Sequence, residues 1–441
     1  MRVLWVCNTL PGIAAEAMGR AAGNKEGWLS GALKSLADKL CDRAGEDTGE
    51  LTLAIAAPSS DMSAKGTDIS GKRVSLIKGS DILIYEFYED TVHPEIYDEG
   101  LEADFEHIIK EFAPDTVHVF GTEYGHCLAV SRVVSGINRQ GSDIKLLIGL
   151  QGIISECAIR YTAGLPDDIV RSRTFRDIIK KDNIAMQALK FTLRGEHELE
   201  AIGYATDITG RTAFDRQWSE AHAPEAVYHH MNETLRPIFY EGTWDVTGCD
   251  RHVIFMSQGD YPLKGLHNVL SILPEIIERY PDTRLVVAGM NLMDVSGLKN
   301  RIRLSGYGRY LRELIRRYNL WEHVKFTGPL DPEGMKEQYL ECGVYLCASS
   351  LENSPNSMGE AMLLSVPVVA PRVGGIPSMI EDGTEGMLYD RIEEIPDLIC
   401  RLFGDDGLAT ELGAAGMNRA LKTHDPKTNL TRLLEIYEEI R

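Results

Sequence analysis

The sequence predicts an α/β protein built from two doubly wound, Rossmann-like halves. Its 441 residues are enough for two or three domains, each with a sizeable apolar core. Short apolar runs typical of buried parallel strands alternate with helical segments along most of the chain. The stretch GTWDVTGCD (242–250) loses this periodicity and contains glycines, so we expect the linker between the halves there.

The first half is expected to alternate strands and helices. Residues 73–79 and 81–87 should pair as a hairpin, and 206–224 should form strand, turn and helix. Gly12 follows the first strand, where it would let the backbone approach a ligand phosphate; an ordinary turn is the alternative. The expected strands are 3–7, 51–57, 73–79, 81–87, 114–121 and 145–152, and the expected helices are about 28–40, 97–111, 126–137 and 165–204.

Two polar residues in this half have competing interpretations. His118 lies inside a strand, and we expect it in the core rather than in a catalytic site. Arg211 is expected either to meet an acidic ligand or to form a salt bridge within its own domain.

The second half repeats the alternation of strand and helix. Residues 297–314 are expected as a polar loop leading into a helix, and 391–441 as helices rich in Leu and Glu. The remaining expected segments are strand, loop and helix over 252–277, a strand at 283–290, strand, turn and helix over 323–339, and strands at 344–348 and 366–370.

A helix should begin in the segment SSLENSPNSM, which follows the strand 344–348. Ser354 is the expected N-cap, and Pro355 then occupies the first helical position, where its missing N–H matters least. Parallel α/β sheets bind anions at such strand-to-helix junctions, because free N–H groups and the helix dipole face the ligand. We therefore expect Asn356, Ser357 and Met358 to offer N–H groups to a phosphate.

Two carboxylates flank this helix start. Glu352 lies in the loop and Glu360 lies in the helix, with seven residues between them. Since carboxylates repel phosphate, we expect them to accept hydrogen bonds from hydroxyls, such as those of a ribose and a hexose. The alternative is a pair of solvated surface glutamates.

The combination of Glu352, Glu360, the following EAM, the strand VPVVA, a GG turn and EDGTEG (381–386) resembles the donor site of the family 4 retaining glycosyltransferases. This resemblance implies the GT-B fold, in which two Rossmann-like domains face each other across a cleft. It covers most of the chain and is clearest over residues 252–390. The domains implied are an acceptor domain at 1–245, a donor domain at 246–425 and a final helix at 426–441 that packs back on the first domain.

The resemblance also assigns roles to residues. Glu360 is expected to bind the ribose, Glu352 to contact a sugar hydroxyl and Lys264 to neutralise the departing diphosphate. The catalytic candidates are Glu352 and Lys264; the donor-binding candidates are Glu360, Asn353, Asn356, Ser357, Met358, Gln258, Gly12 and Leu330; and the sugar or acceptor candidates are Gln151, Gly152, Glu123, Tyr124 and His126.

The chain departs from the family pattern at two of these positions. Gln258 stands where the family usually has an arginine, six residues before Lys264, which leaves one protein cation for the pyrophosphate. Gln151 stands where many members have a histidine, and an amide cannot carry a proton. These departures keep a non-catalytic nucleotide-sugar-binding subunit open as an alternative to an enzyme.

Charge and cysteine usage restrict partners and location. The net charge of −20 opposes an electrostatic grip on nucleic acid or anionic bilayers. A local basic patch around Arg171 to Arg176, or at Lys180 and Lys181, would be an exception, with a solvated helix face as the alternative. The eight cysteines include no CxxC pair, and no apolar run of 18 residues or signal peptide is evident, so we expect a cytoplasmic protein with at most weak peripheral membrane contact.

The function that the resemblance implies is retaining transfer of a sugar from a UDP- or GDP-linked donor to a hydroxyl of a growing, lipid-linked glycan. No metal and no cofactor besides this nucleotide-sugar substrate are expected. A nucleotide-sugar epimerase or a sugar phosphorylase would use the same fold, because fold alone does not fix chemistry. A phosphorylase would need a pyridoxal-binding lysine and usually a much longer chain.

Overall fold

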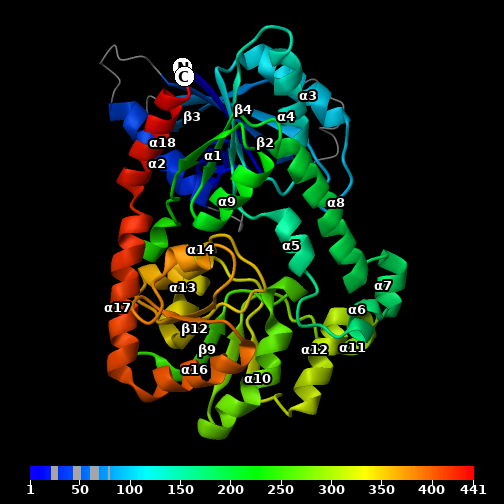
Figure 1. The fold of residues 1–441 in the computed structure, drawn as a ribbon, viewed down its shortest axis with the longest axis vertical. Helices are drawn as coiled ribbons and strands as arrows, with labels where there is room; N and C mark the ends of the chain where they lie inside the picture. The colour runs from blue at the N-terminus through cyan, green and yellow to red at the C-terminus, as the bar shows by residue number, and fades with distance from the viewer. Residues whose placement is uncertain (21–27, 43–50, 60–68, 78–79) are drawn as a thin grey trace. The chain divides into compact units, whose positions relative to one another are not determined.

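The computed structural model describes residues 1–20, 28–42, 51–59, 69–77 and 80–441. Their contacts divide the chain into two compact units, each built around one sheet (Figure 1). The first unit comprises Met1–Ser155, Thr192–Arg236 and His424–Arg441, and the second comprises Glu156–Phe191 and Pro237–Thr423.

These contacts group residues differently from the boundaries expected at 245 and 425, which stay a prediction. Residues 156–191 belong to the second unit. The 242–250 stretch, where we expected a linker, also belongs to it. Trp244 explains the latter: its side chain is buried, and its Nε1–H donates to the carbonyl of Cys342 at 2.7 Å.

The first unit has an eight-stranded sheet in the order β3-β4-β2-β1-β5-β6-β7-β8. Every neighbouring pair is parallel except the β3–β4 hairpin, which confirms the pairing predicted for these two strands. The strands are β1 Arg2–Cys7, β2 Thr52–Ser59, β3 Lys72–Ile77, β4 Ser80–Tyr88, β5 Thr116–Phe120, β6 Lys145–Gly149, β7 Asp207–Gly210 and β8 Val227–His230. The helices are α1 Gly12–Ala17, α2 Trp28–Asp42, α3 Gly100–Phe112, α4 Gly125–Asn138, α9 Ala213–His222 and α18 Pro426–Glu439, while α5 Ile154–Arg160 and α8 Ile184–Ile202 run across the division between the units.

Two apolar cores cover the two faces of this sheet. Successive strand residues point to opposite faces, so Leu4 and Val6 of β1 enter one core while Val3 and Trp5 enter the other. Helices α3 and α4 close the first core, and α2 and α18 close the second (Figure 1). A sheet buried on both faces explains why its strands read as continuous apolar runs rather than alternating ones.

The last helix, α18, is tied to the centre of this sheet by polar contacts. The Tyr437 hydroxyl accepts from the Nε1–H of Trp5 at 2.7 Å and lies 2.8 Å from Nδ1 of His118. His118 is fully buried, which confirms the prediction that it belongs to the core. Burial lowers its pKa to about 3, so the ring is neutral at physiological pH.

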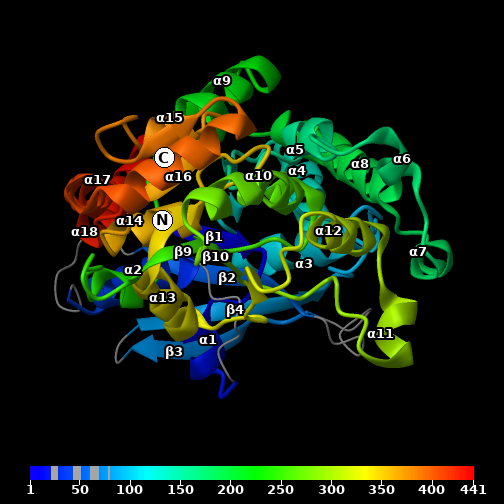
Figure 2. The same cartoon turned by 90° about the horizontal axis from the view of Figure 1, so that it is seen from below.

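The second unit has a six-stranded, wholly parallel sheet in the order β11-β10-β9-β12-β13-β14. Relabelled from its first strand, this order is 3-2-1-4-5-6, the Rossmann order. Figure 2 shows α10 beside α16, which pack against each other on this sheet. The strands are β9 Asp250–Met256, β10 Arg284–Val287, β11 Val324–Phe326, β12 Cys342–Leu346, β13 Val368–Pro371 and β14 Met387–Tyr389. The helices are α6 Asp167–Arg171, α7 Phe175–Lys180, α10 Leu266–Arg279, α11 Gly297–Arg303, α12 Gly306–Arg317, α13 Pro332–Glu341, α14 Asn356–Leu363, α15 Ile376–Met379, α16 Ile395–Gly404 and α17 Asp406–Thr423, with short 3₁₀ turns η2 Pro237–Tyr240, η3 Pro262–Lys264 and η4 Ile392–Glu394.

One buried histidine helps to fasten residues 156–191 to this unit. Nε2 of His267 lies 3.1 Å from the carbonyl oxygen of Ala163, and its Nδ1 lies 3.1 Å from the Tyr307 hydroxyl. A neutral ring satisfies both contacts, with Nε2–H donating and Nδ1 accepting. Burial lowers the pKa of His267 to about 4, in keeping with the neutral form.

We expect His267 to make the fold sensitive to mild acid. Its pKa is lower in the folded chain than the unfolded value of about 6.5, so its contribution to stability is present above pH 6.5 and is lost as the pH falls toward 4. Between pH 7 and pH 5 the loss from this one ring is about 2 kcal/mol. His267→Gln should flatten this part of the pH dependence of the free energy of unfolding, measured by urea denaturation. His107→Gln, at an exposed histidine of α3, is the control; equal slopes for both variants would contradict the assignment.

Candidate functional site

The strand order of the second sheet reverses between β9 and β12, and two loops leave the carboxyl ends of these strands together. Ligands of open α/β sheets bind at this reversal point. The loop after β9 ends in the 3₁₀ turn that carries Lys264, and the loop after β12 carries Glu352. The fold thereby brings together two predicted catalytic residues 88 positions apart, with Nζ of Lys264 2.6 Å from Oε1 of Glu352.

The hydrogen bonds of Glu352 leave one carboxylate oxygen available. Oε1 accepts from Lys264 and from the Ser349 hydroxyl, both at 2.6 Å. Oε2 has no donor among the residues that the structure describes. The Glu352 side chain is 16% exposed and that of Lys264 is 19% exposed, so a ligand hydroxyl can reach this pair from solvent.

The same pair controls the charge of the lysine. Burial disfavours the charged ammonium of Lys264, but the Glu352 carboxylate beside it outweighs burial and raises the pKa of Lys264 well above its usual value. Lys264 is therefore a permanent cation at any physiological pH. Because Glu352 already balances this charge, an anionic ligand must compete with the carboxylate for the ammonium.

Two glycines with left-handed backbones hold the loops in place. Gly374 has φ +52°, and a Cβ there would lie 2.0 Å from the carbonyl oxygen of Glu352, which accepts from the Gly375 N–H at 3.0 Å. Gly265 has φ +71°, and its Cβ would lie 1.9 Å from the carbonyl oxygen of Ala348. The predicted glycine turn, Gly374-Gly375, therefore contacts the backbone of Glu352 so closely that a side chain at Gly374 would not fit.

Helix α14 begins one residue later than predicted. Pro355, rather than Ser354, is the N-cap, and Asn356 is the first helical residue. The Pro355 carbonyl accepts from the N–H of Met358 at 3.0 Å, so the prediction that Met358 offers a free N–H is wrong. Ser357 occupies the second helical position, where no carbonyl of the helix can accept its N–H.

The polar side chains around this helix start are largely enclosed. Glu360 is 4% exposed in α14, and Asn353 is 5% exposed in the preceding loop. The Ser357 hydroxyl lies 2.9 Å from the hydroxyl of Tyr345. The alternative of two solvated surface glutamates is therefore wrong, since Glu360 is buried and Glu352 is largely buried and paired with Lys264.

The other two donor candidates of this unit lie in loops at the same edge of the sheet. Gln258 is half-buried in the loop after β9, the loop that also carries Lys264. Leu330 is half-buried in the turn between β11 and α13. Two strand spacings, roughly 10 Å, separate the ends of β11 and β9, so these loops form one continuous carboxyl edge.

The first sheet has its own reversal point, between β1 and β5, and a second group of predicted residues gathers there. Glu123 follows β5; its Oε2 accepts from Nδ2 of Asn8 at 2.8 Å, and its Oε1 accepts from the N–H of Gly152 at 3.3 Å. Tyr124 is half-buried at the N-cap of α4. Glu123, Tyr124 and Gly152 are thus close neighbours within the first unit.

Gln151 belongs to a buried charged cluster that sequence reasoning did not detect in full. Its Nε2 donates to Glu233, whose carboxylate also forms an ion pair with Arg211. Both charged side chains are about 5% exposed or less, which confirms the domain-internal salt bridge considered for Arg211. Glu233 was missed because its partners lie 82 and 22 residues away, a distance that local pattern does not reveal.

Glu198 of α8 is a second carboxylate that sequence reasoning missed. It is 1% exposed and accepts from the N–H groups of Ile154 and Ser155 at the start of α5, at 3.0 and 2.8 Å. Burial raises the pKa of Glu198, while these hydrogen bonds oppose the shift. It appeared in the sequence only as one charge in a charged helix, so no signal marked it.

Two predicted site residues do not fit their assigned positions. His126 is fully buried, with Nδ1 2.7 Å from Oε2 of Glu89, so it is not placed to touch a sugar. Gly12 does not lie in an open loop, because the short helix α1 begins at it, and its N–H donates to the Ser30 hydroxyl at 2.8 Å. That N–H is not available to a phosphate.

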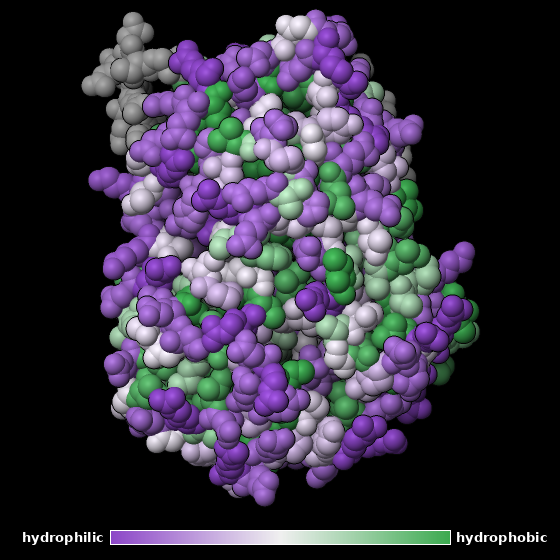
Figure 3. Space-filling model, in the orientation of Figure 1, coloured by the Kyte–Doolittle hydropathy of each residue, from purple (hydrophilic) through white to green (hydrophobic). Residues whose placement is uncertain are grey.

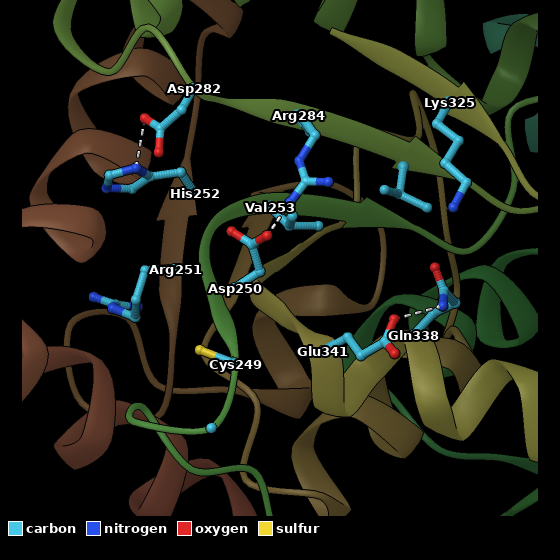
Figure 4. Close-up of a pocket in the computed structure, with 12 residues that line it drawn as sticks. Cys249, Asp250, Arg251, His252, Val253, Asp282, Arg284, Lys325, Gln338 and Glu341 are labelled. Carbon is cyan, nitrogen blue, oxygen red and sulfur yellow. Dashed lines mark hydrogen bonds and ion pairs between the residues drawn. The ribbon is translucent and has the colours of Figure 1, made fainter.

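A polar cavity of about 730 Å³ lies elsewhere in the second unit, around the amino ends of β9 and β10. Figure 4 shows that polar groups in it pair with one another: Arg284 with Asp250, and His252 with Asp282. It lies at the end of the sheet opposite Lys264 and Glu352. Within the described residues, no group of three His, Cys, Asp or Glu side chains is arranged to hold a metal ion.

Residues 248–419 match the family described as Glycosyl transferases group 1. The chain is 26% identical over 192 residues to a phosphatidyl-myo-inositol mannosyltransferase of Mycobacterium leprae, which is 43% of this chain and 46% of that protein. It is 28% identical over 199 residues to a GDP-mannose-dependent alpha-(1-6)-phosphatidylinositol monomannoside mannosyltransferase of Mycolicibacterium smegmatis, covering 42% and 48% of the two chains. The chain thus spans about half the length of these relatives.

Two solved structures resemble the whole chain. A sucrose-phosphate synthase from Thermosynechococcus elongatus has a TM-score of 0.68 at 14% identity, covering 100% of this chain and 99% of that one. Anabaena HepE in complex with UDP has a TM-score of 0.61 at 16% identity and covers 100% of both chains. The predicted GT-B fold class, with two Rossmann-like α/β domains, is confirmed.

We expect Gly374→Ala to disturb the site more than an ordinary left-handed glycine would. The new Cβ would collide with the Glu352 carbonyl in addition to straining the backbone, so the free energy of unfolding should fall by about 3 kcal/mol or more. Gly383→Ala is the matched control, because Gly383 has φ +74° with open space around it and should cost only about 1 kcal/mol. If both variants lost the same free energy of unfolding in urea denaturation, the predicted collision with the Glu352 carbonyl would be contradicted.

Proposed function

We propose that this chain is a retaining glycosyltransferase that moves a sugar from a nucleotide diphosphate donor to a hydroxyl acceptor in polysaccharide or glycoconjugate biosynthesis. The observation that supports this most directly is the Lys264–Glu352 pair at the reversal point of the sheet within the group 1 domain. A cation for the leaving group and a carboxylate for a sugar hydroxyl lie side by side there.

Lys264 and the start of α14 would stabilise the departing diphosphate. The ammonium exchanges its contact with Glu352 for a phosphate oxygen, and the Ser357 N–H adds a donor at the positive end of the helix dipole. Such donors act most strongly on charge that develops as the bond breaks, because they are already oriented before the reaction. Asn353 and Asn356 border the same loop and helix start and complete the proposed donor site.

Glu352 and Glu360 would hold the sugars. The Oε2 of Glu352 would accept from a hydroxyl of the transferred hexose, while the Ser349 hydroxyl keeps the carboxylate oriented after Lys264 has moved to the phosphate. Glu360, one turn into α14, would accept from the ribose hydroxyls. Leu330, at the far end of the carboxyl edge, would pack against the nucleotide base. Gln258 would lie nearer the phosphates.

The reaction keeps donor and acceptor on one face of the sugar. The bond between the anomeric carbon and the diphosphate oxygen breaks, the acceptor oxygen bonds to that carbon, and the departing phosphate oxygen takes the acceptor proton. No protein base is then required, which suits a chain with Gln151 where many relatives of this type have a histidine. We propose that neither metal nor any additional cofactor takes part.

The names of the relatives support the donor and acceptor classes that we propose. UDP is bound in the HepE structure, and the M. smegmatis relative is named for GDP-mannose, so we propose a UDP- or GDP-linked sugar. The mycobacterial relatives are named for phosphatidylinositol acceptors, so we propose a lipid-linked glycan acceptor reached from the cytoplasm. The described part of the chain includes no helix with the length and hydrophobicity needed to cross a bilayer.

A second function has its own support. Lys264 is already balanced by Glu352, and Gln258 offers no second cation, so the site has less positive charge than a diphosphate-transfer site of this family usually has. A subunit that binds a nucleotide sugar without transferring it would tolerate this arrangement. A nucleotide-sugar epimerase is the remaining alternative on the same fold.

Removing either partner of the pair should abolish transfer. Lys264→Ala and Glu352→Gln are each expected to lower kcat on the order of 10²-fold or more, because each removes a group that meets the reacting sugar or its leaving group. Sugar release from a panel of nucleotide sugars measures this. Arg279→Gln is the control, since it breaks an exposed ion pair to Asp397 in the same unit.

The fold of these variants needs its own check, because each leaves one partly buried charge unpaired. The double variant Lys264→Met/Glu352→Gln removes both charges and should unfold near the wild-type denaturant concentration while remaining inactive. Full activity of either single variant would refute the proposed roles. Absence of any sugar release by the wild type, with donor binding intact, would favour the binding subunit.

The matching nucleotide sugar should stabilise the chain in thermal unfolding. A ligand that binds only the folded state adds about 2.7 kcal/mol to the free energy of unfolding at 100 times its Kd. We expect a UDP- or GDP-linked sugar to raise Tm, and adenosine diphosphate sugars to raise it less. A Tm unchanged by every member of the panel would contradict a nucleotide-sugar site.

A further inference from the structure

Helix α7 exposes its apolar side chains and buries an acidic one. Phe175, Ile178 and Ile179 are 62%, 63% and 62% exposed, and their spacing of three and four places them on one helix face. Asp177, on the opposite side, is 2% exposed. A surface helix normally directs its apolar face toward the core, so this orientation is reversed.

Hydrogen bonds fix the reversed orientation. The Asp177 carboxylate accepts from the N–H of Gly306 at 2.9 Å and from the N–H of Thr174 at 3.0 Å, and pairs with Arg176 at 3.2 Å. Gly306 begins α12, so the buried acid fastens α7 to the body of the second unit. Rotating the apolar face inward would break these contacts, and the face therefore stays outward.

A second short helix extends the apolar surface. Helix α11 packs beside α7, and its Leu298 and Ile302, four residues apart, are 75% and 45% exposed. We call Phe175, Ile178, Ile179, Leu298 and Ile302 the α7–α11 patch. Figure 3 shows apolar surface emerging at the edge of the molecule where Figure 1 places α7.

Basic side chains surround this patch. Residues 171–181 and 297–303 contain eight basic residues and one acidic residue, the buried Asp177, in a chain of net charge −20. Within the described part of the chain, the exposed members of this set form no ion pair. They are Arg171, Arg173, Lys180, Lys181, Lys299, Arg301 and Arg303.

We propose that the α7–α11 patch docks this protein on an anionic lipid bilayer surface. Apolar side chains that enter the acyl boundary, with Lys and Arg at headgroup level, are the composition of interfacial membrane-binding segments. The net charge of −20 does not oppose this contact, because repulsion is screened beyond about 8 Å at physiological ionic strength and the exposed charges on α7 and α11 themselves are all basic. The solvated helix face considered from the sequence does not account for five exposed apolar side chains.

The charges favour a bilayer over a second copy of this chain. Two copies meeting through this patch would bring the same basic rims face to face, which costs free energy. An anionic bilayer instead presents negative charge around every inserted side chain. The inference does not rest on the proposed enzymatic function, because it concerns a surface and can be tested without donor or acceptor.

Vesicle flotation tests the proposal. The full chain should float with vesicles of equal phosphatidylglycerol and phosphatidylcholine, should bind pure phosphatidylcholine far less, and should lose most binding in 0.5 M NaCl. Phe175→Ser/Ile178→Ser should reduce the partition coefficient on the order of tenfold or more. Lys180→Gln/Lys181→Gln should reduce it by a similar factor on the anionic vesicles only.

The matched control is Val92→Ser/Ile96→Ser, which removes two apolar side chains that are 77% and 67% exposed in the first unit. It should bind like the wild type, and all variants should keep the wild-type Tm. Absence of flotation by the wild type, or flotation unchanged by Phe175→Ser/Ile178→Ser, would overturn the proposal. So would a wild-type dimer on size exclusion that this double variant converts to a monomer, with no vesicle binding by either.

Discussion

The contact on which the candidate site depends is the ion pair between Lys264 and Glu352. It exists because the strand order of a parallel sheet reverses between β9 and β12, which lets two loops leave the carboxyl edge side by side. Backbone contacts then hold these loops: Ser350 donates to the carbonyl of Leu263, and Gly375 donates to that of Glu352. With the loops held in this way, Nζ of Lys264 lies 2.6 Å from Oε1 of Glu352.

Each unit gathers polar residues at the point where the strand order of its sheet reverses, but the residue types differ. In the second unit, the reversal point places a permanent cation next to a carboxylate and a helix start, an arrangement suited to a phosphorylated sugar. In the first unit, the reversal point gathers Glu123, Asn8 and Gly152, and the neighbouring buried cluster joins Gln151 to Glu233. The carboxylates there already have partners within the first unit: Glu123 accepts from Asn8 and Gly152, and Glu233 pairs with Arg211.

Sequence reasoning succeeded where the information is local. The strand, loop and helix around Glu352 were predicted because apolar runs, a proline at the helix start and a glycine pair each act over a few residues. It failed by one residue at the N-cap, and it separately assigned Met358 a free N–H, which the Pro355 carbonyl in fact accepts. The roles predicted for Gly12 and His126 were wrong for another reason: their hydrogen-bond partners, Ser30 and Glu89, come from other segments of the chain.

The sequence by itself determined the two doubly wound sheets and the position of the loop that carries Glu352, because hydrophobic periodicity and turn chemistry are written in neighbouring residues. Lys264 and Glu352 were singled out by the family resemblance, and the contact between them was not predicted. Only the tertiary structure decided that Glu233 and Glu198 are buried partners, that residues 156–191 join the second unit and that α7 turns its apolar face outward. Each of these depends on a contact across tens of residues, such as Asp177 with Gly306. Burial and charge pairing at that range follow from how the chain packs, and no local pattern specifies them.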